Sequence, residues 1–154
     1  MLKSIKHFFA SNLGIQEIED TPKFQKIELA YAALLVEVIN SDYKIDIRES
    51  KKLLEILNEK LDSNYADLHE IIELAKIESE EATSLYEFTR LINDEYNYQE
   101  KVELIGNMWN IAFSDEQLDK YEEYLIRKIS DLIYVSHADF IQSKLKAKNT
   151  SAQK

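Results

Sequence analysis

The stretch SDYKIDIRE at residues 41–49 is repeated, in pattern, by SDEQLDKYE at residues 114–122. Both copies have a Ser-Asp pair, an apolar residue, and then an Asp followed three positions later by a Glu. Apolar residues flank each copy at helical spacing, so that residues 29–57 align with residues 102–130. The repeat predicts two related halves, each built from a helix, an acidic turn and a second helix.

The composition indicates an all-α protein. The chain of 154 residues contains 2 Gly and 1 Pro, too few for a turn-rich β protein, while 45% of its residues are hydrophobic and 31% are charged. A chain of this length buries roughly two-thirds of its unfolded surface in a single domain. Without cysteine it forms no disulfide. We expect a compact bundle of seven to eight helices made of the two halves.

Helical periodicity and capping signals divide the chain into segments. We expect an amphipathic N-terminal helix at residues 1–13, an acidic connector at 14–21, the helical domain at 22–147 and a disordered tail at 148–154. Asn97 with Glu100 is a capping-box pair inside the domain, and Ser136 is expected to cap the last helix. The helices expected in the domain cover approximately residues 22–40, 46–61, 63–80, 84–96, 97–112, 119–134 and 136–147.

The N-terminal helix has two interpretations. Its apolar face, formed by Leu2, Ile5, Phe9 and Leu13, docks on the domain in the first of them. In the second it rests on an anionic membrane surface or in the groove of a partner protein, with the lysines of the segment assisting. The sequence leaves both interpretations open.

The charge of the chain is strongly acidic. Its 29 Asp and Glu against 19 Lys and Arg give a net charge of -10 at pH 7. Residues 1–14 and 142–154 contain lysines and no acid, so the negative charge is concentrated between them. Such a body repels phosphate backbones, and we expect no nucleic-acid partner. No apolar run is long enough for a transmembrane helix and no secretory signal is recognisable, so we expect a cytoplasmic protein.

The acids of the repeat are the candidate site, and they are Asp42, Asp46, Glu49, Asp115, Asp119 and Glu122. The last two acids of each copy have the spacing of a capping box, which needs no ligand. The first acid of each copy precedes the cap in a bend where carbonyls also point outward, and carboxylates with carbonyls are the ligands of Ca²⁺ or Mg²⁺. The spacing excludes an EF-hand, because its twelfth position is Leu53 or Ile126 instead of Glu.

Familiar catalytic patterns are missing from the sequence. The histidines, His7, His69 and His137, stand alone, which excludes Glu-x-x-His di-iron and His-Glu-x-x-His zinc motifs. Gly14 and Gly106 cannot form a phosphate-binding loop, and no thiol exists to act as a nucleophile. A metal-dependent hydrolase built from carboxylates alone has no spacing in its favour. We therefore expect no enzymatic activity.

Four segments around the repeat carry a resemblance to a known family. They are LAYAALLVEVINSD at residues 29–42, followed by Asp46 and Glu49, then LYEFTRL at 85–91, WNIAFSD at 109–115 and LDKYEEYLIR at 118–127. In these segments the chain resembles the TerB-like tellurite-resistance family, and it looks most like the small stand-alone bacterial members. The resemblance extends over residues 1–147, nearly the whole chain.

The resemblance implies an all-helical domain of two related halves without known catalysis. Some members are thought to bind divalent cations through the repeated acids, and relatives are linked to tellurite and other stress resistance, to phage defence and to membrane-associated complexes. A protein partner of such a complex, at the inner membrane face, is therefore expected. The family usually has Gly after the first Asp of each turn, where this chain has Tyr43 and Glu116. The alternative function is a peripheral protein-interaction or membrane-surface adaptor with no metal site.

Overall fold

A computed structural model describes residues 26–40, 47–61, 65–81, 85–114 and 119–152 of the chain. The described residues form seven helices and no strand, which confirms the predicted all-α class. The helices are α2 (Lys26–Asn40), α3 (Ile47–Leu61), α4 (Tyr65–Glu81), α5 (Tyr86–Glu95), α6 (Tyr98–Ala112), α7 (Lys120–Leu132) and α8 (His137–Ala152).

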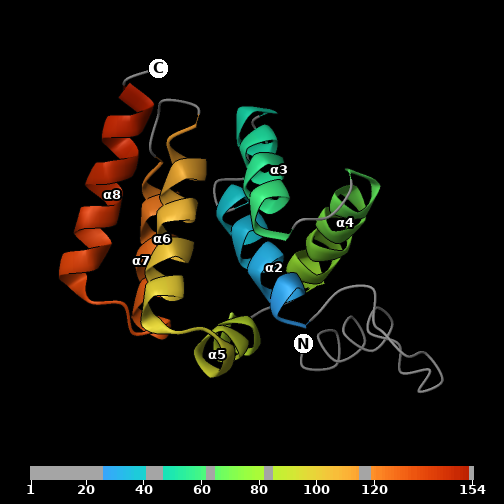
Figure 1. Cartoon of the computed structure of the whole chain (residues 1–154), viewed down its shortest axis with the longest axis horizontal. Coiled ribbons are helices and arrows are strands. Elements are labelled where there is room, and N and C mark those ends of the chain that lie inside the picture. The colour runs from blue at the N-terminus through green and yellow to red at the C-terminus, as the bar shows by residue number, and fades with distance from the viewer. Residues whose placement is uncertain (1–25, 41–46, 62–64, 82–84, 115–118, 153–154) are drawn as a thin grey trace.

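Helix α2 is the centre of the bundle. Its residues 29–36 are all buried, as expected for a helix that is apolar around most of its circumference. It contacts α3, α4, α5, α6 and α7. In Figure 1, α3 and α4 lie on one side of the molecule and α6, α7 and α8 on the other, with α2 between them.

Helices α3 and α7 are amphipathic and present one apolar stripe each to the core. The stripe of α3 contains Leu53 and Ile56, and the stripe of α7 contains Ile126 and Ile129, and all four side chains are buried. These are the residues that the repeat aligns with each other. The local pattern of one half therefore predicts which face of the corresponding helix in the other half is buried.

The contacts between helices follow the same correspondence. Helix α2 contacts α3 and α4, and α6 contacts α7 and α8. Across the halves, α2 contacts α7 and α3 contacts α6, which are equivalent pairs if α2 corresponds to α6 and α3 to α7. This pattern is consistent with the two related halves expected from the sequence.

Trp109 on α6 is the largest fully buried side chain. It occupies the position that the repeat assigns to Val36 on α2, which is also buried. The indole ring lies 5.8 Å from the ring of Phe113 and 5.2 Å from the ring of Phe140 on α8, measured between centroids. The aromatic cluster joins α8 to α6 at the end of α6 that leads into the second acidic turn.

The end of the chain differs from the expectation of a disordered tail from residue 148. Helix α8 continues to Ala152. No Gly or Pro interrupts the sequence after Phe140, and the hydroxyl of Thr150 donates a hydrogen bond to the carbonyl of Lys146, within the helix. Composition suggested a solvated tail, but polar residues of adequate helix propensity extend a helix that has already been nucleated.

Two expected segments, residues 1–13 and the connector 14–21, lie outside the described residues. Among the helices that the structure describes, none is long and apolar enough to cross a membrane.

Candidate functional site

The six acids of the repeat divide into two groups. Glu49, Asp119 and Glu122 belong to the described residues, at the beginnings of α3 and α7. Asp42, Asp46 and Asp115 lie outside them. Glu49 is the third residue of α3 and Glu122 the third residue of α7, so the two halves place them at equivalent helical positions.

Asp119 and Glu122 form the capping box that their spacing predicts. The Asp119 Oδ1 atom accepts a hydrogen bond of 2.7 Å from the backbone N–H of Tyr121, and the Asp119 side chain also accepts from the backbone N–H of Glu122. In return, the backbone N–H of Asp119 donates to Glu122 Oε1 at 3.4 Å. These bonds satisfy amide groups that the first turn of a helix leaves without partners.

Burial sets the two glutamates apart from ordinary capping residues. The Glu49 side chain is 1% exposed and that of Glu122 is 0% exposed. Carboxylates are rarely removed from water so completely, because an ionised group loses its hydration. The positive end of the helix dipole offsets part of this cost at the first turn. The structure thus encloses one carboxylate at the same position in each half.

This burial is not among the predictions made from the sequence, although the sequence contains a signal for it. Glu49 lies one helical turn before Leu53, and Glu122 one turn before Ile126. Both glutamates therefore continue the apolar stripe of their helix toward its N-terminus. A charged residue in line with a buried stripe is the pattern that would have identified them.

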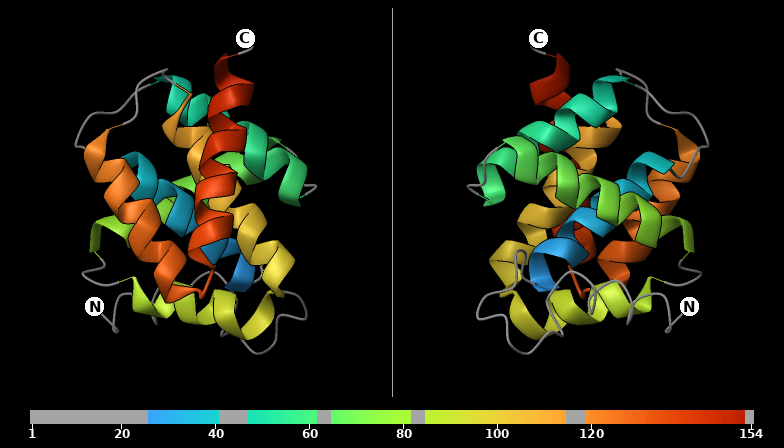
Figure 2. Two further views of the ribbon diagram at one scale, coloured as in Figure 1. Left: turned by 90° about the vertical axis from the view of Figure 1, so that its left-hand side faces the viewer. Right: turned by 90° about the vertical axis from the view of Figure 1, so that its right-hand side faces the viewer.

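The two glutamates lie in the first turns of α3 and α7. Figure 2 shows that α3 and α7 both begin in the upper part of the bundle. Within the described residues, no three His, Asp or Glu side chains cluster closely enough to hold a metal ion. Glu49, Asp119 and Glu122 thus do not form a complete site among themselves.

A second polar cluster lies where α2, α3, α5 and α6 meet. The Asn107 Nδ2 atom of α6 donates a hydrogen bond of 2.6 Å to the phenolic oxygen of Tyr31 on α2. The Tyr31 ring meets the ring of Tyr96 edge to face at 6.1 Å. The Lys60 ammonium lies 5.4 Å from the centre of the first ring and 4.9 Å from the centre of the second. Such contacts between a cation and aromatic faces are attractive.

The environment of this cluster favours neutral phenols. Burial raises the pKa of Tyr31 well above its usual value near 10, and the charge of Glu103 adds to the effect, against the opposing influence of the Asn107 hydrogen bond. Burial also raises the pKa of Tyr96, with further contributions from Tyr31 and nearby glutamates. Both phenols stay protonated at neutral pH.

The comparison with protein families fits the all-helical fold and its repeated acids. The model described as Tellurite resistance protein TerB matches residues 28–145. The chain belongs to the TerB family. The match includes both copies of the acidic repeat and extends from α2 into α8. Neither the comparison with curated proteins nor that with solved structures gave a match. The assignment of this chain to the TerB family is therefore supported by the matching family model and by the residues of the acidic repeat.

Proposed function

We propose that this TerB-family domain is non-catalytic and binds a divalent cation, Ca²⁺ or Mg²⁺, through its two acidic turns. The ligands would come from Asp42, Asp46, Glu49, Asp115, Asp119 and Glu122. The observation that supports the proposal best is the burial of Glu49 and Glu122, one in each half. A cation is the natural counter-charge for carboxylates withdrawn from water, and hard divalent ions prefer oxygen ligands.

Capping and metal binding are compatible roles for these side chains. A carboxylate has two oxygens with about four lone-pair positions in total. The capping bond from the backbone N–H of Asp119 reaches one oxygen of Glu122, Oε1. The helix start would hold the carboxylate in place, and the second oxygen would face the ion. The cap is then the device that positions a ligand.

The biological setting proposed for the domain is tellurite resistance or a related stress or defence response in the cytoplasm. The partner would be another protein of a stress-resistance complex that assembles at the inner membrane face. The family membership supports this setting, and the acidic charge of the chain disfavours nucleic acid. Binding of the cation would join or brace the two acidic turns and so change the surface offered to that partner.

The decisive experiment replaces the acids by their amides. Asn caps a helix about as well as Asp, and Gln can accept the return bond of a capping box, so the caps survive while the charge that holds a hard cation is lost. The variant carries Asp46→Asn, Glu49→Gln, Asp119→Asn and Glu122→Gln. With free metal at 100 times its dissociation constant, the parent should gain about 2.7 kcal/mol, and the variant nothing.

The melting temperature measures this difference. A gain of that size corresponds to roughly 5–10 °C for a domain of this length. A control variant should retain the response of the parent, because it removes four charges from exposed positions. It carries Glu59→Gln, Asp94→Asn, Glu95→Gln and Asp131→Asn. A parent protein whose melting is unmoved by millimolar Ca²⁺, Mg²⁺ or Mn²⁺ would reject the cation site.

The second candidate is a peripheral adaptor with no metal site. The amphipathic pattern of residues 1–13 favours it, because an apolar face flanked by lysines suits an anionic membrane surface. Co-sedimentation with anionic liposomes should then require that segment. Equal sedimentation of the full chain and of a chain without residues 1–13 would reject a membrane role for the segment.

A further inference from the structure

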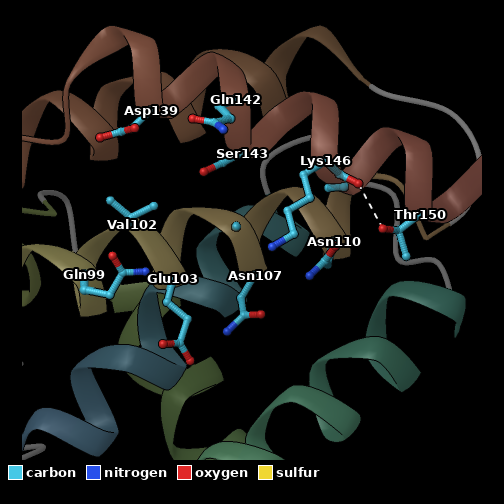
Figure 3. A pocket seen from close by; sticks show the side chains of 12 residues that line it. Gln99, Val102, Glu103, Asn107, Asn110, Asp139, Gln142, Ser143, Lys146 and Thr150 are labelled. Atoms are coloured by element: carbon cyan, nitrogen blue, oxygen red, sulfur yellow. Dashed lines mark hydrogen bonds between the residues drawn. The ribbon is translucent and has the colours of Figure 1, made fainter.

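A groove lined mainly by polar residue types runs along the seam between α6 and α8. Its volume is about 410 Å³, within the range of roughly 300–1,000 Å³ that ligand sites occupy. Figure 3 shows Gln99, Asn107 and Asn110 along α6 and Gln142, Ser143 and Lys146 along α8, with the Asn107 side chain pointing away from α8. The groove is thus walled by two helices that start at the same end of the molecule, where Tyr98 on α6 donates a 2.5 Å hydrogen bond to Asp139 on α8.

Gly106 forms the floor of the groove in the middle of α6. A Cβ atom added to this residue would meet no other atom within 4 Å. The repeat aligns Gly106 with Ala33 on α2, whose surface is completely covered. At this position the surface of α6 is therefore open, whereas the equivalent surface of α2 is covered by other helices.

The walls of the groove offer uncharged hydrogen-bonding groups. The side chains of Gln99, Asn110 and Gln142 make no hydrogen bond to other described residues, and each carboxamide supplies two donors and one acceptor. Ser143 adds a hydroxyl that both donates and accepts. A ligand that fits this lining should itself present both hydrogen-bond donors and acceptors.

The lining disfavours the other common classes of ligand. No aromatic side chain lines the groove, so sugars and nucleobases have no ring to stack on. Its cation, Lys146, is outnumbered by Glu103 and Asp139, which makes the groove a poor phosphate site. A polypeptide main chain meets the requirement, because its N–H and C=O groups alternate and carry no net charge.

We propose that the α6–α8 groove binds an extended peptide segment of a partner protein through the main chain of that segment. Gln99 and Asn110 are separated by about 16 Å along the axis of α6. An extended chain covers this distance with about five residues. The groove and the acidic turns are different parts of the surface of the domain. Peptide binding in the groove does not require a metal ion. Carboxamides that pair with the backbone would tolerate many side-chain sequences in the partner.

Two substitutions at Gly106 test the proposal with the fold held constant. Gly106→Leu projects a branched side chain into the groove, whereas Gly106→Ala adds a single methyl group and leaves most of the space free. Both should melt at or above the temperature of the parent, since Gly in a helix interior is less favourable than Ala or Leu by about 0.5–1 kcal/mol. A difference in peptide binding between the two variants would then show that the peptide binds in the groove.

The probe is a phage-displayed library of random dodecapeptides, selected against the full chain in the presence of EDTA. Selected peptides are synthesised, and their affinities are measured by fluorescence anisotropy. We expect binding that Gly106→Leu weakens by about tenfold or more and that Gly106→Ala leaves within about twofold. N-methylation of central peptide nitrogens should weaken binding similarly, since it removes main-chain donors.

Three results would overturn the proposal. They are the failure of the library to yield a binding peptide, equal binding by the parent and Gly106→Leu, and binding that survives N-methylation throughout the peptide. The side-chain amide signals of Gln99, Asn110 and Gln142 in NMR spectra give an independent reading, because they should shift when the peptide binds. The EDTA in every sample keeps the outcome separate from the cation experiment.

Discussion

Tyr134 has a backbone conformation that tyrosine rarely adopts. Its φ of 63° lies in the left-handed region, and the residue follows Ile133, the C-cap of α7. The backbone N–H of Val135 donates to the carbonyl of Ser130 at 3.0 Å, and that of Tyr134 donates to the carbonyl of Asp131 at 3.2 Å. These two bonds form a Schellman motif, in which the left-handed position normally belongs to glycine. The ring is 75% exposed, with the Lys101 ammonium 5.9 Å from its centre.

Replacing Tyr134 by glycine should stabilise the protein. The left-handed conformation costs a residue with a Cβ atom about 1–2 kcal/mol, while the cation–π contact that would be lost is worth about 0.5–1 kcal/mol at an exposed site. We expect a net gain of up to about 1 kcal/mol in the free energy of unfolding, measured by urea denaturation. Tyr134→Ala is the matched control, since it loses the ring but keeps the Cβ atom. Equal stability of the Gly and Ala variants would contradict the assignment of strain to this position.

The start of α6 agrees with the sequence prediction. Asn97 Oδ1 accepts a 2.8 Å hydrogen bond from the backbone N–H of Glu100, and Glu100 Oε1 accepts one of 2.9 Å from the backbone N–H of Asn97. This is the capping box expected from the spacing of the two residues. Helix α5, in contrast, starts after Leu85 without any side-chain capping bond. The start of α6 therefore has a stabilising device that the start of α5 does not have.

Removal of the Asn97 cap should weaken α6 measurably. Asn97→Ala leaves the backbone N–H of Glu100 without its side-chain acceptor and should cost about 0.5–2 kcal/mol in the free energy of unfolding. Asn97→Asp should be neutral within a few tenths of a kcal/mol, because Asp caps equally well. Urea denaturation of the three proteins gives both values. A loss in Asn97→Asp as large as in Asn97→Ala would show that the cap is not the source of the stability.

What the sequence could predict depended on whether the deciding interaction was local. Caps at Asn97 and Asp119 involve residues three apart, and their type and spacing are sufficient to identify them. The buried stripes of α3 and α7 follow from helical period, which aligns Leu53 with Ile126 and Ile56 with Ile129. The length of α8 was not, because composition alone does not show whether a polar segment continues an existing helix.

Properties that depend on packing between distant segments were out of reach of the sequence. The stripes of α3 and α7 place Glu49 and Glu122 on the apolar face of their helices, but how completely each carboxylate is buried depends on the packing of the whole bundle. Gly106 and Ala33 were aligned as equivalent small residues, but one is the floor of a groove and the other is enclosed by neighbouring helices. The sequence identified the correspondence between the halves and could not show where they differ.

At the scale of the whole molecule, the cluster around Tyr31 connects the two halves. The hydrogen bond from Asn107 to Tyr31 joins α6 to α2, and Lys60 at the end of α3 lies against both tyrosine rings. The raised pKa of Tyr31 means that the folded state keeps its proton to higher pH than the unfolded chain does. The stability from this residue is therefore complete below about pH 10 and is lost progressively above it.

This linkage predicts that Tyr31→Phe changes its effect with pH. At pH 7 the variant should be less stable by about 1 kcal/mol, because Asn107 loses its acceptor. Above about pH 10, Tyr31 ionises in the unfolded chain but not in the folded protein, so the free energy of unfolding of the parent should fall by about 1.4 kcal/mol per pH unit. The variant has no phenol at this position and should not show this decrease. The two free energies of unfolding should cross about one unit above pH 10. A difference that stays constant between pH 8 and pH 11 would contradict the burial of an ionisable phenol at the junction.

The single tryptophan of the chain also gives the molecule an optical reporter. Trp109 is completely buried, and the Lys144 ammonium lies 5.5 Å from the centre of its ring. Lys144 is in turn paired with Glu123, the residue after the buried Glu122 of the second acidic repeat. Indole emission depends on the charges and the polarity around the ring. A rearrangement at the beginning of α7 would thus be transmitted through one ion pair to the fluorophore, and the intrinsic fluorescence of the unlabelled protein would record it.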